Sequence, residues 1–550
     1  MKPLNAVGRI VVSLAVPLFV ASLFASDTIL LHGHIYTEDP KSPWAEALAI
    51  TSGRIDAVGS DAEISRYRQS LTKVVDLQGR TVIPGIVDIH EHVLYGGMAL
   101  HGFNLSTPEF NITPNDEDAF VDTIKVYAAS HPDEKVLFGR ASFPTTPDSA
   151  AKLELLDRAV PDRPLVIHAT SEHALWVNSK TLALAGIGNK PVADATLERF
   201  IVRDSNGHPT GVFRESSMQL INNALPPMPL EQRVALLRGA EHYLNRFGIT
   251  SVVELTGDLG ELEAFAALRD RGELTIRTRT GLGKVAVNHH LTPQFLADLD
   301  KARKLYHDDW VSANLVKFFA DGVGNPPPMF YEPAEYRRLL IELDKRGYQI
   351  VTHAIGAGAV HAVLDAYADL EKTNGPRDRR LRMEHVFNIE TEDMARFSKL
   401  STIVGMQPAF CCGGFAGEHS NEFGSVEKSG ALLSFSSDWP CSWPPDPLAG
   451  IQEALMREVR RPVTMHGVAP GPPEYNAPDQ KITVEQAVAA YTKAGAYAEF
   501  AENRIGTLEA GKEADLAVLS QDIFHVRPEQ IGQTQVVMTM VGGKVVFTEP

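Results

Sequence analysis

The chain has 550 residues, which is too long for one simple domain, and its 44% hydrophobic content allows a large core. Its formal net charge is −17 at pH 7, and no basic cluster occurs anywhere in the sequence. This balance argues against nucleic acid as a partner, because the phosphate backbone is bound by clustered Lys and Arg.

The N-terminus has the pattern of an export signal. Lys2 and Arg9 precede an almost entirely apolar stretch, 10–24, which small residues follow. This order predicts a signal peptide over 1–26 and a periplasmic or secreted mature protein. An uncleaved anchor is the alternative, although the stretch is short for a stable span. We expect no stable membrane span once the signal is removed.

Short strand patterns with glycine turns occur at both ends of the chain. The runs are 28–31, 47–50 and 54–58 near the start, and 514–519, 536–541 and 544–547 near the end. We expect 27–80 and 500–550 to form one small, composite β-sandwich domain.

Between these ends, from 81 to 499, strand patterns alternate with helical patterns. The first candidate is the apolar run 82–89, which leads to His90 and His92. The other seven are 251–254, 276–280, 315–319, 349–352, 382–384, 402–406 and 433–436. Such alternation predicts an α/β fold with a closed parallel sheet, a (β/α)8 TIM barrel. The stretch from about 100 to 236 interrupts the first repeat, and we expect it to be an inserted subdomain covering the barrel mouth.

Histidines and one aspartate follow these strands. His90 and His92 are one residue apart and so share a face of the first strand. His353, His385 and Asp438 end three later strands, and barrels build their sites from such strand ends. Any one of these residues could be an inert hydrogen-bonded histidine or a helix cap. Their joint pattern favours a site for a divalent metal ion.

On these residues the chain resembles the amidohydrolase superfamily, and specifically its amidohydrolase-3 (YtcJ-like) group. The resemblance covers nearly everything after residue 27 and is specific to the family but not to a substrate. The motifs that carry it are 84–92, 174–180, 248–253, 316–322, 352–354, 384–385, 437–440 and 504–516.

The resemblance implies a role for each candidate ligand. His90 and His92 would bind a first metal ion, and His353 and His385 would bind a second ion or complete the first site. Asp438 would bind metal and act as the general base. The resemblance implies one or two divalent ions, with Zn²⁺ as the default for imidazole ligands and iron or manganese as alternatives. Lys317 is either a carboxylated lysine bridging two ions or a structural lysine paired to a carboxylate.

Three further residues have weaker assignments. His173, in the inserted subdomain, matches a family position expected near the substrate, and Arg140 is a second candidate of this kind. Ordinary packing is the alternative for both. Glu91 departs from the family pattern, since that position is usually small or apolar; its carboxylate should point away from the metal and needs a partner.

The implied reaction is hydrolysis of a non-peptide C–N bond (an N-acyl, N-formyl or cyclic amide) through a metal-activated water. Asp438 would accept a proton, and the metal or His173 would polarise the carbonyl of a small-molecule amide-type substrate. A lactone or ester hydrolase using the same site is one alternative, and a catalytically silent binding protein of the same fold is another. A homodimer is compatible with the sequence.

The chain contains three cysteines. In an oxidising compartment either Cys411 or Cys412 could bridge to Cys441 across adjacent barrel loops. Three free thiols are the alternative.

Overall fold

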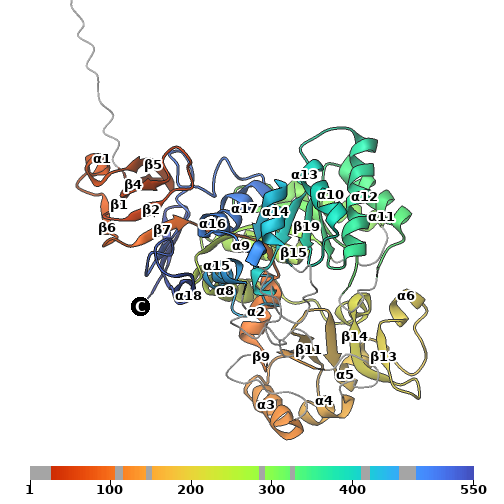
Figure 1. Ribbon diagram of the computed structural model, residues 1–550. Helices are drawn as coiled ribbons and strands as arrows, with labels where there is room; N and C mark the ends of the chain where they lie inside the picture. Colours follow the sequence, from red (N-terminus) through yellow and green to blue (C-terminus); the bar gives the residue numbers. More distant parts are fainter. Residues whose placement is uncertain are drawn as a thin grey trace, which may run out of the picture.

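The computed structural model describes residues 26–105, 116–143, 152–283, 291–322, 329–410, 421–457 and 478–549. Figure 1 shows three parts: a central barrel, a β-rich part where the red and navy ends of the chain meet, and an orange-to-yellow lobe below the barrel. The predicted signal peptide, apart from Ser26, lies outside the described residues, as do Cys411 and Cys412.

The central sheet has eight parallel strands in the order β21-β20-β19-β18-β17-β16-β15-β8. Their bounds are β8 Ile86–Glu91, β15 Ile249–Gly257, β16 Arg277–Leu282, β17 Val311–Phe319, β18 Gln349–Ala354, β19 Arg382–His385, β20 Ile403–Met406 and β21 Leu433–Phe435. The gap between β21 and β8 is bridged just after β21. The Asp438 N–H donates to the His90 carbonyl, and the His92 N–H donates to the Trp439 carbonyl, both at 2.9 Å. This nearly closed parallel sheet confirms the predicted TIM barrel.

Helices cover the outside of the barrel (Figure 1). They are α8 Leu230–Asn245, α9 Leu259–Asp270, α10 Pro293–Leu305, α11 Pro333–Lys345, α12 Ala357–Asn374, α13 Thr391–Lys399, α14 Phe423–Ser429, α15 Pro447–Met456, α16 Val484–Tyr491 and α17 Lys493–Ala498. In α12, Val360, Val363, Leu364 and Tyr367 are buried, which is the spacing of one helical face. That face packs into the main core between the helices and the sheet.

A separate apolar cluster lies on the strands and includes Val87, Val253, Leu315, Val351 and Ile403. Each comes from a different barrel strand and is buried. Side chains of this kind fill the interior of a closed barrel, so a site can form only above them, at the strand ends.

Two further sheets contain both ends of the chain. One has the order β5 (Arg54–Gly59), β4 (Ala47–Thr51), β1 (Thr28–Leu31), β6 (Lys73–Asp76). The other has the order β24 (Lys544–Thr548), β23 (Val536–Val541), β22 (Leu516–Leu519), β7 (Thr81–Pro84), β2 (His34–Tyr36), β3 (Trp44–Ala45). Leu30, Leu48, Val82, Leu516 and Met540 share one core across the two sheets. The domain boundaries proposed above stay a prediction.

The expectation that 82–89 forms one continuous strand is wrong. The chain leaves one sheet at Pro84 and enters the barrel at Ile86. A Cβ atom on Gly85 would lie 2.2 Å from the Thr250 Oγ1, so only glycine allows this close approach to β15. The hydropathy of the run could not reveal the change of sheet, because both halves are buried.

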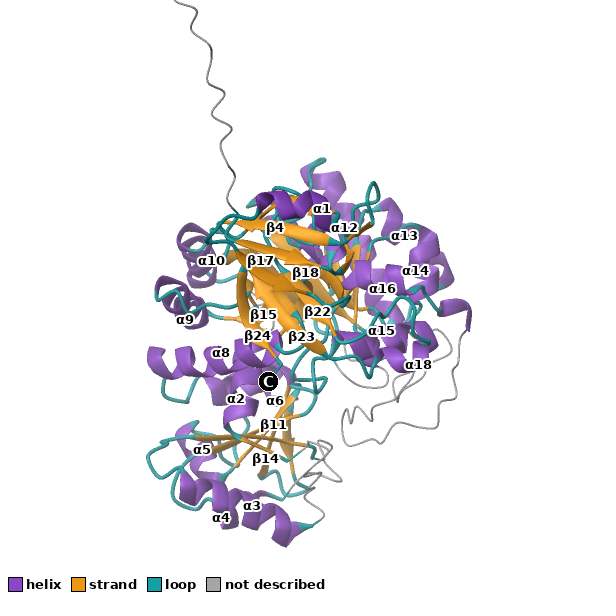
Figure 2. Ribbon diagram, turned by 90° about the vertical axis from the view of Figure 1, so that its left-hand side faces the viewer, coloured by secondary structure: helices purple, strands orange, loops and turns teal. Residues whose placement is uncertain are grey.

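The segment between α2 (Val93–His101) and α8 forms its own lobe, which Figure 2 shows below the barrel. Its sheet has the order β13 (Ile201–Arg203), β14 (Pro209–Arg214), β12 (Ala174–Val177), β11 (Leu165–Ala169), β10 (Leu137–Ala141), β9 (Phe103–Asn104). Its helices are α3 (Glu117–Ser130), α4 (Leu153–Ala159), α5 (Ser179–Leu184), α6 (Ala195–Glu198) and α7 (Met218–Asn222). Two apolar clusters of its own pack on the two faces of the sheet.

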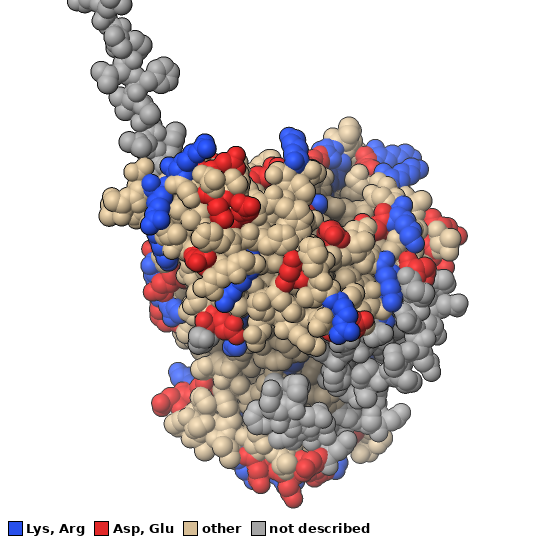
Figure 3. All heavy atoms as spheres, turned by 60° about the vertical axis from the view of Figure 1, so that its left-hand side comes forward, with Lys and Arg blue, Asp and Glu red and all other residues tan. Residues whose placement is uncertain are grey.

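On the face drawn in Figure 3, acidic and basic side chains are interspersed among neutral ones. Among the described residues, no helix combines the length and the apolar character needed to cross a bilayer.

Candidate active site

The candidate ligands meet at the carboxyl ends of the barrel strands. His90 lies in β8 and His92 directly follows it, His353 and His385 lie at the ends of β18 and β19, and Asp438 follows β21. All five side chains line one cavity of about 270 Å³. The structure therefore brings together five residues that the sequence spreads over nearly 350 positions.

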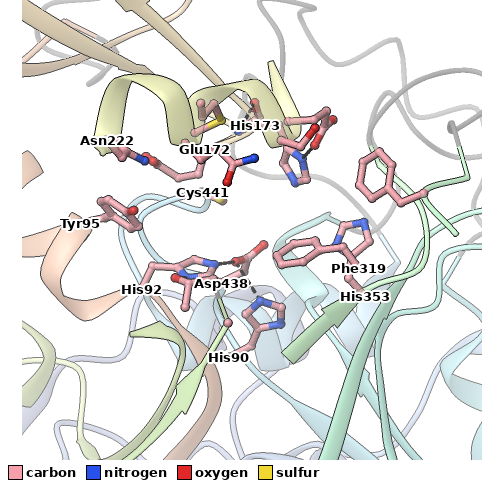
Figure 4. A pocket seen from close by; sticks show the side chains of 18 of the residues that line it. His90, His92, Tyr95, Glu172, His173, Asn222, Phe319, His353, Asp438 and Cys441 are labelled. Carbon is pink, nitrogen blue, oxygen red and sulfur yellow. Dashed lines mark hydrogen bonds and ion pairs between the residues drawn. The ribbon is translucent and has the colours of Figure 1, made fainter. Parts of the chain in front are cut away.

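Asp438 lies between the first two histidines (Figure 4). Its Oδ1 atom is 3.4 Å from the His90 Nε2 and 3.2 Å from the His92 Nε2. His90, His385 and Asp438 offer ligand atoms within 4.8 Å of one another. The His353 ring lies beside this trio, with its centroid 4.4 Å from that of His385.

The other ring nitrogen of three histidines is engaged by a neighbour. These contacts are His90 Nδ1 to Glu384 Oε2 at 2.8 Å, His92 Nδ1 to Thr256 Oγ1 at 2.8 Å, and His385 Nδ1 to Gln407 Oε1 at 2.9 Å. Such partners fix the orientation of a ligating imidazole. They leave each Nε2 free to face the centre of the site.

The unpartnered atoms of the site fit a cation. The Asp438 Oδ1 and the His353 Nε2 are buried, and neither makes a regular hydrogen bond among the described residues, although the His92 Nε2 lies 3.2 Å from the Asp438 Oδ1. The nearest carboxylate oxygen to the His353 Nε2, from Asp321, is 3.6 Å away. Leaving such atoms unsatisfied is costly, and one or two divalent ions bound at these strand ends would satisfy them.

The protonation states also suit a metal. Burial lowers the pKa of His385 to about 3 and lowers the pKa of His90 and His353 well below the usual value, so these rings are neutral. Burial alone would raise the pKa of Asp438, but contact with His92 and the nearby His385 lower it overall. His92 differs: burial is outweighed by Asp438 and Glu254, which raise its pKa to about 9. A metal ion would have to displace a proton from that ring.

Lys317 lies beside His90. Its Nζ atom is 3.3 Å from the His90 Nε2, and the side chain is buried. Burial lowers the pKa of Lys317 to about 8, although Glu384 and Asp438 oppose the shift. Among the described residues, no carboxylate oxygen lies within 4 Å of the Lys317 Nζ. Whether this lysine is carboxylated or structural stays a prediction.

Glu91 has a hydrogen-bond partner for its buried carboxyl group. Its Oε1 accepts a hydrogen bond of 2.6 Å from the Ser437 hydroxyl, and the side chain is buried. Burial and the neighbouring Asp88 raise the pKa of Glu91 well above its usual value. It is therefore a neutral support for the 437–438 segment and does not line the cavity.

The inserted lobe closes the cavity from the opposite side (Figure 4). His173 faces the candidate ligands, and its ring centroid lies 5.5 Å from that of His353. Its Nδ1 is 2.8 Å from the Glu215 Oε2. Burial would lower the pKa of His173, but Glu215 raises it overall. Other lining residues come from the lobe, the barrel and its loops: Tyr95, Met218, Gln219, Asn222, Asn223, Phe319 and Phe330.

Two other sequence candidates have different outcomes. Arg140 does not line the cavity; it lies behind it, where it donates to the Thr170 carbonyl at 2.6 Å and to the Pro440 carbonyl. Arg140 therefore links the loops that contain Thr170 and Pro440 and does not face the space available to a substrate. Cys441 lines the cavity, where it is buried and has no disulfide partner among the described residues; its proposed partners, Cys411 and Cys412, lie outside them. The disulfide stays a prediction.

Sequence reasoning missed Glu215 as the partner of His173 and missed the α7 residues that roof the cavity. His173 and Glu215 are 42 positions apart. They belong to a lobe whose docking on the barrel leaves no periodic pattern in the sequence. The only local signal was that Glu172, His173 and Glu215 are charged or titratable residues placed next to buried strands.

This protein is a TIM barrel in which imidazoles and a carboxylate converge at the strand ends. This arrangement is typical of hydrolases that bind a metal ion at the mouth of the barrel. The model of the amidohydrolase family matches residues 73–547, and the chain belongs to this family. The chain is thus a hydrolase of the amidohydrolase family.

Two curated relatives extend over almost the whole chain. The chain is 27% identical to the YtcJ protein of Bacillus subtilis (strain 168) over 555 residues, which is 94% of this chain and 98% of that protein. It is 26% identical to the N-substituted formamide deformylase of Arthrobacter pascens over 553 residues, 94% of this chain and 97% of that protein.

Solved structures share the fold. An uncharacterized metal-dependent hydrolase from Pyrococcus horikoshii OT3 superposes with a TM-score of 0.70 at 22% identity, covering 91% of this chain and 99% of that one. Atrazine chlorohydrolase TrzN from Arthrobacter aurescens TC1, complexed with zinc, gives a TM-score of 0.53 at 14% identity, covering 94% of both chains. At these identities the likeness concerns the fold alone.

Proposed function

We propose that this protein hydrolyses a non-peptide amide bond of a small molecule, of the N-acyl, N-formyl or cyclic amide type. The observation that carries the proposal is the buried Asp438 carboxylate, with its unpartnered oxygen between two imidazoles at the floor of the cavity. The similarity to a relative named for deformylation of N-substituted formamides supports the choice of bond.

His90, His92, His353, His385 and Asp438 would hold one or two divalent ions, and we propose zinc. Neutral imidazoles suit zinc, and the distant fold neighbour TrzN is complexed with it. We also propose that Lys317 is carboxylated, because its position beside His90 would place a carbamate oxygen among the other ligands. When bound, such an ion supplies Lewis acidity and lowers the pKa of a water molecule toward neutrality.

The protein side chains then perform the proton transfers. Asp438 accepts the proton of the attacking water and delivers it to the leaving nitrogen. Glu215 orients His173 and raises its pKa, and the protonated ring would donate a hydrogen bond from Nε2 to the carbonyl oxygen as negative charge develops there. The cavity of about 270 Å³ restricts the substrate to a small molecule.

The test is a substrate panel run on the purified, zinc-loaded chain. It contains N-substituted formamides, N-acyl amines, cyclic amides, lactones and simple esters, with release of amine or acid as the readout. We expect turnover of at least one amide group of the panel, lost on chelation and restored by zinc. Turnover confined to lactones or esters would contradict the proposed bond, and no turnover with a fully loaded metal site would contradict catalysis.

We further propose that the mature protein is exported, on the strength of the positively charged, apolar and small-residue order of the first 26 residues. N-terminal sequencing of the protein from the periplasmic and medium fractions of a bacterial expression host tests this. A new N-terminus near residue 27 is expected; an intact N-terminus in the membrane fraction indicates an anchor.

A further inference from the structure

A second group of metal-binding side chains lies outside the active site, where the two ends of the chain meet. His34 belongs to β2, and Asp522 and His525 belong to the turn after β22. The Asp522 Oδ2 is 3.0 Å from the His34 Nδ1 and 2.8 Å from the His525 Nδ1. We propose that these three residues bind a divalent transition-metal ion, distinct from the ion of the active site. None of them lines the catalytic cavity.

The turn presets two of the three ligands. The His525 and Val526 N–H groups donate to the Asp522 carbonyl at 3.2 and 3.0 Å. The Asp522 Oδ1 accepts from the Phe524 N–H at 2.9 Å, which leaves Oδ2 turned toward both imidazoles. One carboxylate oxygen, Oδ1, is therefore held by the backbone, and the other, Oδ2, is available to bind a metal ion.

The third ligand, His34, is held in place by contacts with aromatic side chains. The His34 ring stacks on Trp44, with centroids 4.0 Å apart and planes 7° from parallel. Phe524 contacts Trp44 edge-on at 5.0 Å. Because the His34 ring is already fixed, little conformational freedom is lost when it binds an ion.

The chemistry of the three ligands points to zinc or a similar ion. Two imidazoles and one carboxylate match the preferences of Zn²⁺, Ni²⁺ and Cu²⁺. Ligand atoms on a tetrahedral zinc ion lie about 3.3 Å apart, given bonds of about 2.0–2.1 Å. The observed 2.8 and 3.0 Å need to widen by only a few tenths of an ångström. The His525 side chain is 70% exposed, so it can make this adjustment, and water can reach the remaining coordination position.

An ion at this site would link segments 488 positions apart in the sequence. It would hold β2, near the start of the chain, against the turn near its end (Figure 1). Because the unfolded chain does not bring these ligands together, binding would stabilise the folded protein by mass action. The bound ion would therefore cross-link the two ends of the chain within this β-sheet and stabilise it.

The test compares Zn²⁺ binding by the full-length wild type and by His525→Ala, using equilibrium dialysis and metal analysis. His525 is exposed, so its removal should leave folding intact. We expect the wild type to bind one equivalent more than the variant, and Zn²⁺ to raise the Tm of the wild type by about 2 °C more. Asp522→Asn should lose the same equivalent.

Two controls keep the result specific. His208→Ala removes another exposed histidine, whose side chain is 54% exposed and has one carboxylate neighbour, Asp204 at 3.6 Å; this variant should bind as much Zn²⁺ as the wild type. His525→Ala should lose the same equivalent in a His90→Ala, His385→Ala background, which removes two imidazole ligands of the catalytic site and so separates the two sites. Equal stoichiometry and equal Tm shifts in wild type and His525→Ala would overturn the proposal, and would mean that the carboxylate only accepts two imidazole hydrogen bonds.

Discussion

Two of the candidate ligands have backbones in the left-handed region. The φ angle is 72° at His385 and 57° at Asp438, and neither residue is glycine. Such conformations cost about 1 kcal/mol or more each and persist where the surrounding structure enforces them. Here they turn each side chain from its strand end into the cavity, which a regular strand continuation would not do.

The role of Asp438 can be tested by a single change. Asp438→Asn keeps the shape and one oxygen ligand but removes the group that accepts a proton. We expect metal content to stay near that of the wild type and turnover to fall by about 100-fold or more. Measuring kcat together with zinc content checks both halves. Turnover equal to that of the wild type would exclude Asp438 as the general base.

Glu241 gives a prediction for stability against pH. Its carboxylate is buried in α8 and accepts from the Thr275 N–H and hydroxyl at 2.9 and 3.0 Å. Burial outweighs these bonds and raises the pKa of Glu241 to about 8, from 4.5. The folded protein thus binds a proton more tightly than the unfolded chain, so this contribution is fully present below pH 4.5 and is lost as pH rises toward 8.

Glu241→Gln removes that titration but keeps an oxygen for Thr275. Relative to the wild type, the variant should gain roughly 3 kcal/mol in free energy of unfolding between pH 5 and pH 8. Denaturant unfolding at several pH values measures this difference. A stability difference that does not change with pH would show that the Glu241 carboxyl titrates normally.

At the scale of the element, strand positions were predictable and strand partners were not. The runs 315–319 and 349–352 fall within β17 and β18, because buried parallel strands are continuous apolar runs. The run 82–89 reads the same way yet divides at Gly85 between two sheets. Hydropathy reports that a residue is buried; it does not report which sheet buries it.

The packing of α2 onto the loop after β21 gives a prediction at this scale. A Cβ atom on Gly96 would lie 1.9 Å from the Trp439 ring, which is fully buried and cannot move aside. We expect Gly96→Ala to destabilise the protein by about 3 kcal/mol. It should also lower turnover, because Trp439 adjoins Asp438.

Gly239→Ala in α8 is the matched control. Nothing lies within 4 Å of a Cβ at that exposed helical position. The substitution should be neutral or stabilise by up to about 1 kcal/mol, since alanine favours the helix. Thermal unfolding of both variants measures the contrast. If Gly96→Ala changed the stability no more than Gly239→Ala does, α2 would not pack tightly against Trp439.

At the scale of the whole molecule, the active site depends on two separate parts of the chain, the barrel and the inserted lobe. The barrel supplies the candidate ligands, and these were predictable because strand-end histidines carry a residue-level signal. The inserted lobe supplies His173, Glu215 and the roof. Their assembly was not predictable, because it depends on how two independently folded cores dock and not on any local pattern.

The attachment of the terminal sheets to the barrel depends on a buried ion-pair cluster. Arg277, on β16, donates from Nε to the Asp515 Oδ2 at 2.7 Å and from Nη2 to the Glu513 Oε2 at 3.1 Å. The Arg277 and Asp515 side chains are 6% and 2% exposed. Asp515 also accepts from the Gly542 N–H at 2.6 Å, which ties in the turn between β23 and β24.

Asp515→Asn keeps the oxygen that faces Gly542 but leaves the Arg277 guanidinium with only one carboxylate. We expect a loss of about 3 kcal/mol, because an incompletely paired buried charge is strongly destabilising. Glu231→Gln is the control: it removes one member of the Arg271–Glu231 pair, whose Glu231 side chain is 70% exposed, and should cost less than about 1 kcal/mol. Denaturation of the two variants side by side tests this. If both lost the same small amount, the contact between the terminal sheets and the barrel would rest on apolar packing alone, and the ion-pair cluster would contribute nothing specific to holding the two together.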